Sequence, residues 1–84
     1  MHLSQSNKIN QRATLLLLNK IGELRSQPVQ EIRAGDFNEE NGFFRILWFI
    51  GDNTPYSGTF QIRCQVVHSA NSRVIVESIF YRTE

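Results

Sequence analysis

Four side chains in the C-terminal half of the sequence could bind an anion or move a proton. Arg45, Arg63 and Glu77 lie within apolar stretches and could share one face of a sheet, and His68 ends one of these stretches. Such a group is more often a cross-strand charge pair that contributes under about 1 kcal/mol. A catalytic histidine needs an orienting carboxylate and a cleft, and the sequence assigns neither to His68. We therefore interpret His68 as a hairpin-end residue bonded to backbone or water, and we name no catalytic residue.

Cysteine and carboxylate side chains offer no stronger chemistry. Cys64 is the only cysteine and falls on the apolar side of an alternating stretch, which predicts a buried thiol that packs as a small hydrophobe. Asp36, Glu39 and Glu40 do not have the spacing of a calcium loop, so we interpret them as part of a solvated acidic loop. One cysteine and two histidines cannot supply the ligands of a zinc site. We expect neither a metal nor a cofactor.

The elements that would position these side chains are a helix and several strands. Apolar side chains recur at helical spacing over residues 6–26, at Ile9, Ala13, Leu17, Ile21 and Leu24. Pro28 ends that pattern, and alternation bounded by turn residues predicts strands over about 43–51, 58–69 and 73–83. Residues 29–35 form a weaker strand candidate. We expect residues 1–84 to form a single α+β domain in which the N-terminal helix packs on a three- to four-stranded antiparallel meander.

The alternation of side chains also predicts which face of the sheet meets the helix. The predicted inward set is Phe44, Ile46, Trp48 and Ile50 on the first strong strand, Phe60, Ile62, Cys64 and Val66 on the second, and Val74, Val76, Ser78 and Phe80 on the third. Successive residues of a strand point to opposite faces, so this register gathers most of the apolar side chains on one side. The helix would cover that side with Leu17, Ile21 and Leu24.

The opposite face of the predicted sheet is too apolar for a surface in contact with water. It would carry Phe43, Leu47, Phe49, Val67, Ile75, Ile79 and Tyr81, interleaved with Arg45, Gln61, Arg63, Gln65 and Glu77. A sheet with one solvated face usually alternates apolar and polar residues more cleanly. A monomer seldom exposes a large contiguous apolar patch without a use for it.

The stretch TLLLLNKIGEL, residues 14–24, raises the same question for the helix. Four consecutive leucines cover the whole circumference of a helix, because each residue turns by about 100°. Leu17 points inward, whereas Leu15 and Leu16 project away from the core and Leu18 lies at the flank. Either a partner covers the surplus apolar surface, or residues 29–35 and the acidic loop fold back over it. We favour a partner, and a symmetric homodimer is the commonest closed assembly.

Composition narrows the class of partner. The 84 residues include nine Lys and Arg against eight Asp and Glu, so the net charge of +1 gives no electrostatic reason to expect nucleic acid or a membrane. No apolar run approaches the roughly 20 residues that span a bilayer, or the roughly 7 to 15 of an export signal. We expect a cytoplasmic protein.

One short stretch resembles a known family. Residues 42–50, GFFRILWFI, are similar to a strand of bacterial ribonuclease toxins of the RelE kind, in which a helix also precedes an antiparallel sheet. The resemblance covers nine residues and implies a ribonuclease that uses basic and aromatic residues on a concave, strongly cationic sheet. This chain departs from that pattern because it is nearly neutral, so no catalytic residue is carried over.

We therefore expect a small non-catalytic protein-interaction module, homodimeric or an accessory subunit. Its expected interaction surface consists of Leu15, Leu16, Arg45, Leu47, Phe49, Arg63, Glu77, Ile79 and Tyr81. Aromatic and Arg side chains are the usual anchors of such surfaces. The alternative is a small RNA-processing enzyme or RelE-like toxin that uses the Arg and aromatic side chains of the sheet, because bases stack on aromatics while Arg meets phosphate.

Overall fold

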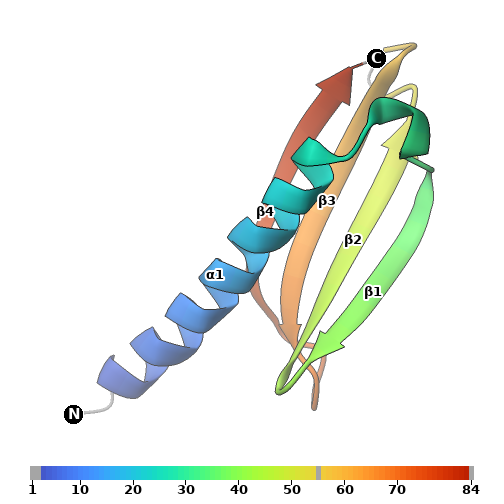
Figure 1. Ribbon diagram of the computed structural model, residues 1–84. Helices are drawn as coiled ribbons and strands as arrows, with labels where there is room; N and C mark the ends of the chain where they lie inside the picture. The colour runs from blue at the N-terminus through green and yellow to red at the C-terminus, as the bar shows by residue number, and fades with distance from the viewer. Residues whose placement is uncertain (1–2, 55, 84) are drawn as a thin grey trace.

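The apolar spacing of the N-terminal segment produces one long helix followed by a sheet, as Figure 1 shows. The computed structural model describes residues 3–54 and 56–83. Its elements are α1 (Leu3–Ser26), the short 3₁₀ helix η1 (Val29–Glu31), β1 (Gly35–Asn41), β2 (Phe44–Asp52), β3 (Thr59–His68) and β4 (Val74–Thr83). The four strands form one antiparallel sheet in the order β1-β2-β3-β4. The expected α+β fold is confirmed, and the helix begins three residues earlier than predicted.

The molecule has two layers, because α1 packs on one face of the sheet. The helix buries Ala13, Leu17, Ile21 and Leu24, chiefly against β3 and β4. Its N-terminal turns extend away from the sheet, which makes the molecule elongated, with extents of 49 × 20 × 19 Å (Figure 1). None of the described helices combines the length and the apolar character that crossing a membrane requires.

The register of the central strands agrees with the predicted one. Ile46 lies opposite Val66, Trp48 opposite Cys64 and Ile50 opposite Ile62, so the inward sets of β2 and β3 face α1 together. Ser78 lies opposite Cys64 and Phe80 opposite Ile62, as expected for the last strand. The buried cluster comprises Ala13, Leu17, Ile21, Leu24, Ile32, Phe44, Ile46, Ile50, Ile62, Cys64, Val66 and Phe80.

A β-bulge changes the faces at the start of β4. The register shifts between Val66 and Val67, and Val67 then lies opposite Val74. As a consequence Ile75, which was expected on the opposite face, packs against the core, and Val74, which was expected in the core, is exposed. A bulge inserts one extra residue into a strand, and strict alternation cannot anticipate it.

The weak strand predicted over residues 29–35 is wrong, and so is the loop predicted after it. Val29–Glu31 form η1 instead, because Pro28 begins a tight turn in which Glu31 and Ile32 donate backbone hydrogen bonds to the carbonyls of Pro28 and Val29 (2.9 and 3.0 Å). The acidic segment that follows is β1, which pairs with β2 along its whole length. Gly42 and Phe43 form the turn of this hairpin, in which Asn41 pairs with Phe44, and the positive φ of Gly42 (61°) suits a tight turn.

Candidate functional site

The face of the sheet turned away from α1, which we call the outer face, gathers most of the expected interaction surface. The register places Asp36, Phe49, Arg63 and Ile79 in one row across the sheet, and Asn38, Leu47, Gln65 and Glu77 in the next. Tyr81 lies opposite Gln61 in a further row. The outer face therefore brings together side chains from all four strands, and within the described residues α1 covers only the inner face.

The charged groups of the outer face pair differently from what the sequence indicated. Glu77 was expected to pair with Arg63 or Arg45, but it accepts a hydrogen bond from the Gln65 side chain that lies opposite it. Arg45 binds Glu40 on β1, with 2.6 Å between Nη2 and Oε1. The register explains the correction, because it places Arg45 opposite both Glu40 and Val67. Arg63 is exposed between Phe49 and Ile79, and it carries the one positive charge of the row formed by Asp36, Phe49, Arg63 and Ile79.

The apolar side chains of the outer face differ in how far their neighbours cover them. Leu47 and Phe49 are half-buried by adjacent strands. Val67, expected to be exposed, is buried where it lies between Arg45 and Val74. Ile79 and Tyr81 on β4 remain 43% and 53% exposed. Among the strand residues of this face, the exposed apolar side chains therefore lie on β4.

The four leucines of α1 divide between the core and the solvent. Leu17 is buried, as predicted. Leu16 packs partly against the core, so the expectation that it projects away is wrong, because it lies on the side of α1 that faces β1 and β2. Leu15 and Leu18 are 60% and 56% exposed. Leu18, which was expected at the flank of the helix, is therefore an uncovered apolar side chain like Leu15.

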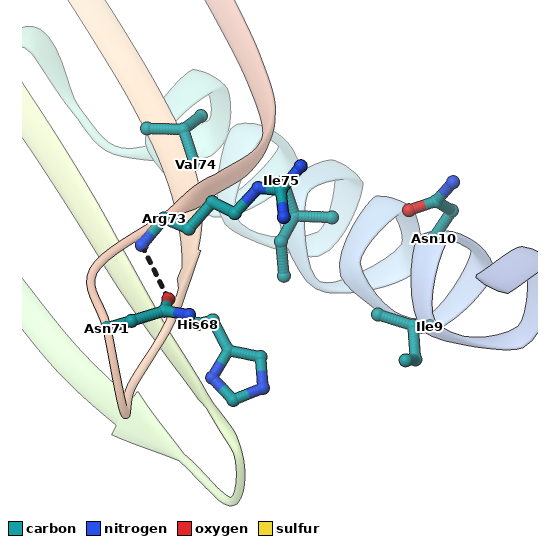
Figure 2. A pocket seen from close by; sticks show the side chains of 7 residues that line it. All are labelled: Ile9, Asn10, His68, Asn71, Arg73, Val74 and Ile75. Carbon is teal, nitrogen blue, oxygen red and sulfur yellow. Dashed lines mark hydrogen bonds between the residues drawn. The ribbon is translucent and has the colours of Figure 1, made fainter.

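His68 lies at a groove that the sequence did not indicate. A cavity of about 370 Å³ opens between the N-terminal half of α1 and the β3–β4 hairpin, and Figure 2 shows its seven lining residues: Ile9, Asn10, His68, Asn71, Arg73, Val74 and Ile75. The Ala70 backbone N–H donates to His68 Nδ1 (3.3 Å), which agrees with the interpretation of a hairpin-end histidine. His68 lies opposite the buried Phe44, on the helix side of the sheet. The sheet therefore separates it from Arg63 and Glu77, and the four candidate groups do not converge.

A buried lysine forms a polar cluster that no local pattern in the sequence indicated. Lys20 Nζ lies 2.7 Å from Glu23 Oε2 and 2.6 Å from Glu39 Oε1. It also lies 4.2 Å from the centre of the Trp48 ring, which in turn stacks on Phe37. Burial by itself lowers the pKa of Lys20, but the hydrogen bonds and charges of the two glutamates outweigh it and raise that pKa above 10.5. An ammonium held charged in this way stabilises the packing of α1 on β1 and β2 rather than acting as a nucleophile.

Cys64 occupies the position that the alternation predicted. Its side chain is fully buried, and burial raises the pKa of the thiol from 9.0 to about 11, although the charge of Lys20 acts to lower it. A thiol in this environment stays protonated at neutral pH and is a poor nucleophile. Cys64 is therefore a packing residue of the core.

Comparison of the chain with models of protein families, with curated proteins and with solved structures finds no match.

Proposed function

We propose that the chain is a small non-catalytic protein-interaction module whose simplest partner is a second copy of itself. The observation that carries this proposal is the exposure of three apolar side chains, Leu15, Ile79 and Tyr81, after the chain has folded. Leu15 comes from α1, whereas Ile79 and Tyr81 come from the outer face of β4, and the described residues leave each of them more than 40% exposed. Removing such surface from water contributes about 25 cal/mol per Å², which offsets part of the entropy that association costs.

The neighbouring groups support protein binding more than catalysis. Tyr81 and Arg63 belong to the residue types that most often anchor protein interfaces, and both are exposed on the outer face. The alternative of an RNA-processing enzyme has less support, because Arg45 is already paired with Glu40 and Glu77 lies on the same face. Carboxylates beside the arginines weaken the attraction of a phosphate backbone.

Polar replacement of the three side chains tests the proposal. The triple variant Leu15→Gln, Ile79→Gln and Tyr81→Gln should stay folded by circular dichroism, because all three are exposed. Its mass in solution should fall relative to the wild type, or a partner bound by the wild type should be lost. Tyr56→Gln is the matched control, since Tyr56 is 75% exposed in the turn between β2 and β3. Salt-sensitive RNA binding that Arg45→Gln with Arg63→Gln abolishes would instead favour the alternative.

A further inference from the structure

Most of the exposed apolar side chains of this molecule belong to α1 and to the last strand of the sheet. Among the described residues, eight large hydrophobic side chains are exposed, and six of them belong to α1 or to β4: Ile9, Leu15, Leu18, Val74, Ile79 and Tyr81. Within the strands themselves, β4 alone carries such residues. β4 is also an edge strand, so the backbone groups that point away from β3 have no partner in the sheet. An edge of this kind is a template for pairing with another strand.

The other edge of the sheet is protected against such pairing. β1 carries Asp36, Glu39 and Glu40 along seven residues and has Phe37 as its only apolar side chain. Antiparallel pairing of β1 with itself about Asn38 would place Asp36 opposite a second Glu40, and pairing about Glu39 would place two Glu39 carboxylates opposite each other. Like charges directly opposite destabilise a strand pair. Natural sheets use edge charges in this way to prevent association.

β4 is complementary to itself. Its regular part after the bulge covers residues 76–83, and Ile79 is one of the two central residues of that segment. Antiparallel pairing about Ile79 sets the two Ile79 side chains against each other on the outer face, and it sets Glu77 opposite Tyr81 of the second copy. No like charges meet, because Glu77 and Arg82 are the only charged residues of β4. On the inner face, this pairing sets Ser78 opposite Phe80 of the second copy.

One exposed leucine of α1 lies on the side of this same edge. The guanidinium of Arg25 lies 5.1 Å from the centre of the Phe80 ring of β4, whereas Lys20 binds Glu39 of β1. Leu18 lies two helical turns before Arg25 and therefore shares its side of the helix. Leu15 lies nearly opposite the buried face of α1 and points away from the sheet, so only the flank that carries Leu18 faces the β4 side.

We propose that two copies of the chain pair edge to edge through antiparallel β4 strands, centred on Ile79, to form one continuous sheet with both helices on the same face. This inference rests on the proposed function and names its partner and contact surface. Ten residues of β4 provide an edge roughly 33 Å long at about 3.3 Å per residue, with Leu18 of α1 on the same side of the molecule. A stable interface covers about 800 Å² of each partner, which is roughly one seventh of this chain's 5823 Å².

A lysine on the edge, combined with amide exchange, tests this arrangement. Ile79→Lys brings two positive charges together at the proposed two-fold axis, and it should weaken the dimer of the wild type at least about tenfold in sedimentation equilibrium. The matched control is Asn38→Lys, an exposed position on the outer face of the opposite edge strand, which should leave the dimer unchanged. Hydrogen exchange of the wild-type dimer should protect the outward amides of β4 but not those of β1.

The outcomes separate this inference from the proposed function. A wild-type dimer that survives Ile79→Lys, with β4 outward amides exchanging as fast as those of β1, overturns edge pairing and leaves association through another surface. A wild type that is monomeric at every concentration also overturns it, and the proposed function then depends on whether a different protein partner is lost in the triple Gln variant. If Ile79→Lys does not fold, the hydrogen-exchange pattern of the wild-type dimer still tests the edge pairing.

Discussion

At the scale of single residues, the burial of Cys64 makes the stability of the fold depend on pH. Its pKa is raised in the folded chain to about 11, from an ordinary 9.0 that it regains on unfolding. The stability that the neutral thiol contributes is present below pH 9 and is lost as the pH rises towards 11, because the unfolded chain releases the proton first. We expect the free energy of unfolding to fall by on the order of 1–3 kcal/mol across this window.

Urea unfolding at several pH values measures this effect. Cys64→Ala should unfold more easily at pH 7, since it leaves a cavity in the core, but its stability should change less between pH 9 and 11 than that of the wild type. The raised pKa of Lys20 contributes in the same direction only above 10.5 and is present in both proteins. Equal slopes in the two proteins would show that Cys64 does not remain protonated in the fold.

Trp48 is the residue through which the Lys20 cluster contacts the core. Its ring packs against the buried cluster, stacks on Phe37 at 5.8 Å between centroids and lies under the Lys20 ammonium. Trp48→Ala should therefore lower the free energy of unfolding by about 3 to 5 kcal/mol, enough to unfold a marginal domain. Thermal melting followed by circular dichroism measures the loss, and Tyr56→Ala, at an exposed turn, should melt like the wild type. An unchanged melting curve for Trp48→Ala would contradict the strand register.

At the scale of elements, an arginine of the last strand caps the helix at the other end of the chain. Arg82 Nη1 donates to the backbone carbonyls of Leu24 (2.8 Å) and Gln27. The last carbonyls of a helix lack partners and carry partial negative charge, so a cation there is stabilising. Arg82→Gln should lower the free energy of unfolding by about 1.5 to 3 kcal/mol, the contribution of hydrogen bonds from a charged donor. Chemical denaturation measures it, and Arg73→Gln, an exposed hairpin position, should have almost no effect.

Gly22 offers a change in the opposite direction. It lies inside α1, and a Cβ added there would meet no atom within 4 Å. Alanine restricts the unfolded chain and favours the helix, so Gly22→Ala should raise the free energy of unfolding by about 0.5 to 1 kcal/mol. A higher thermal midpoint at low protein concentration would confirm it. A lower midpoint would mean that another part of the molecule approaches the helix at this position.

Four elements could be predicted because the signal for each lies within its own segment, whereas β1 depends on a residue elsewhere in the chain. α1, β2, β3 and β4 follow from apolar periodicity within each segment, and their inward faces were predicted except at the bulge, at Leu16, which packs against the core, and at Ile9, which is 41% exposed. β1 was missed because its inward position Glu39 is charged, and that charge is compensated by Lys20 from the helix. Such a partner, 19 residues earlier in the chain, leaves no local signal. Gly42, at the first position of the two-residue turn, is a hairpin signal that could have indicated the strand.

The candidate interaction surface shows the same division. Leu15, Ile79 and Tyr81 could be predicted as exposed, because alternation and helical spacing determine the face on which a side chain lies. The concentration of exposed residues on β4 could not be predicted, since it depends on which strand forms the edge and on the position of the helix above it. Leu16 was misplaced for the latter reason, because α1 leaves room for it on the β1 and β2 side.

At the scale of the whole molecule, size links association to stability. A chain of 84 residues buries only about 60% of the surface that its unfolded form exposes, so small domains often gain stability from oligomerisation. If a second copy covers β4 and Leu18 of α1, folding and dimer formation are coupled by mass action.

The midpoint of thermal unfolding should then rise with protein concentration, by several degrees over a hundredfold range, because each 1 kcal/mol shifts it by about 4 to 8 °C in a domain of this size. Calorimetry at several concentrations measures this dependence. At each concentration Ile79→Lys should melt at a lower temperature than the wild type, as the wild type does when it is diluted, whereas Asn38→Lys should keep the wild-type dependence. A wild-type midpoint that is independent of concentration, in a protein that sediments as a dimer, would place the association outside the folding equilibrium and contradict a pairing that extends the sheet itself.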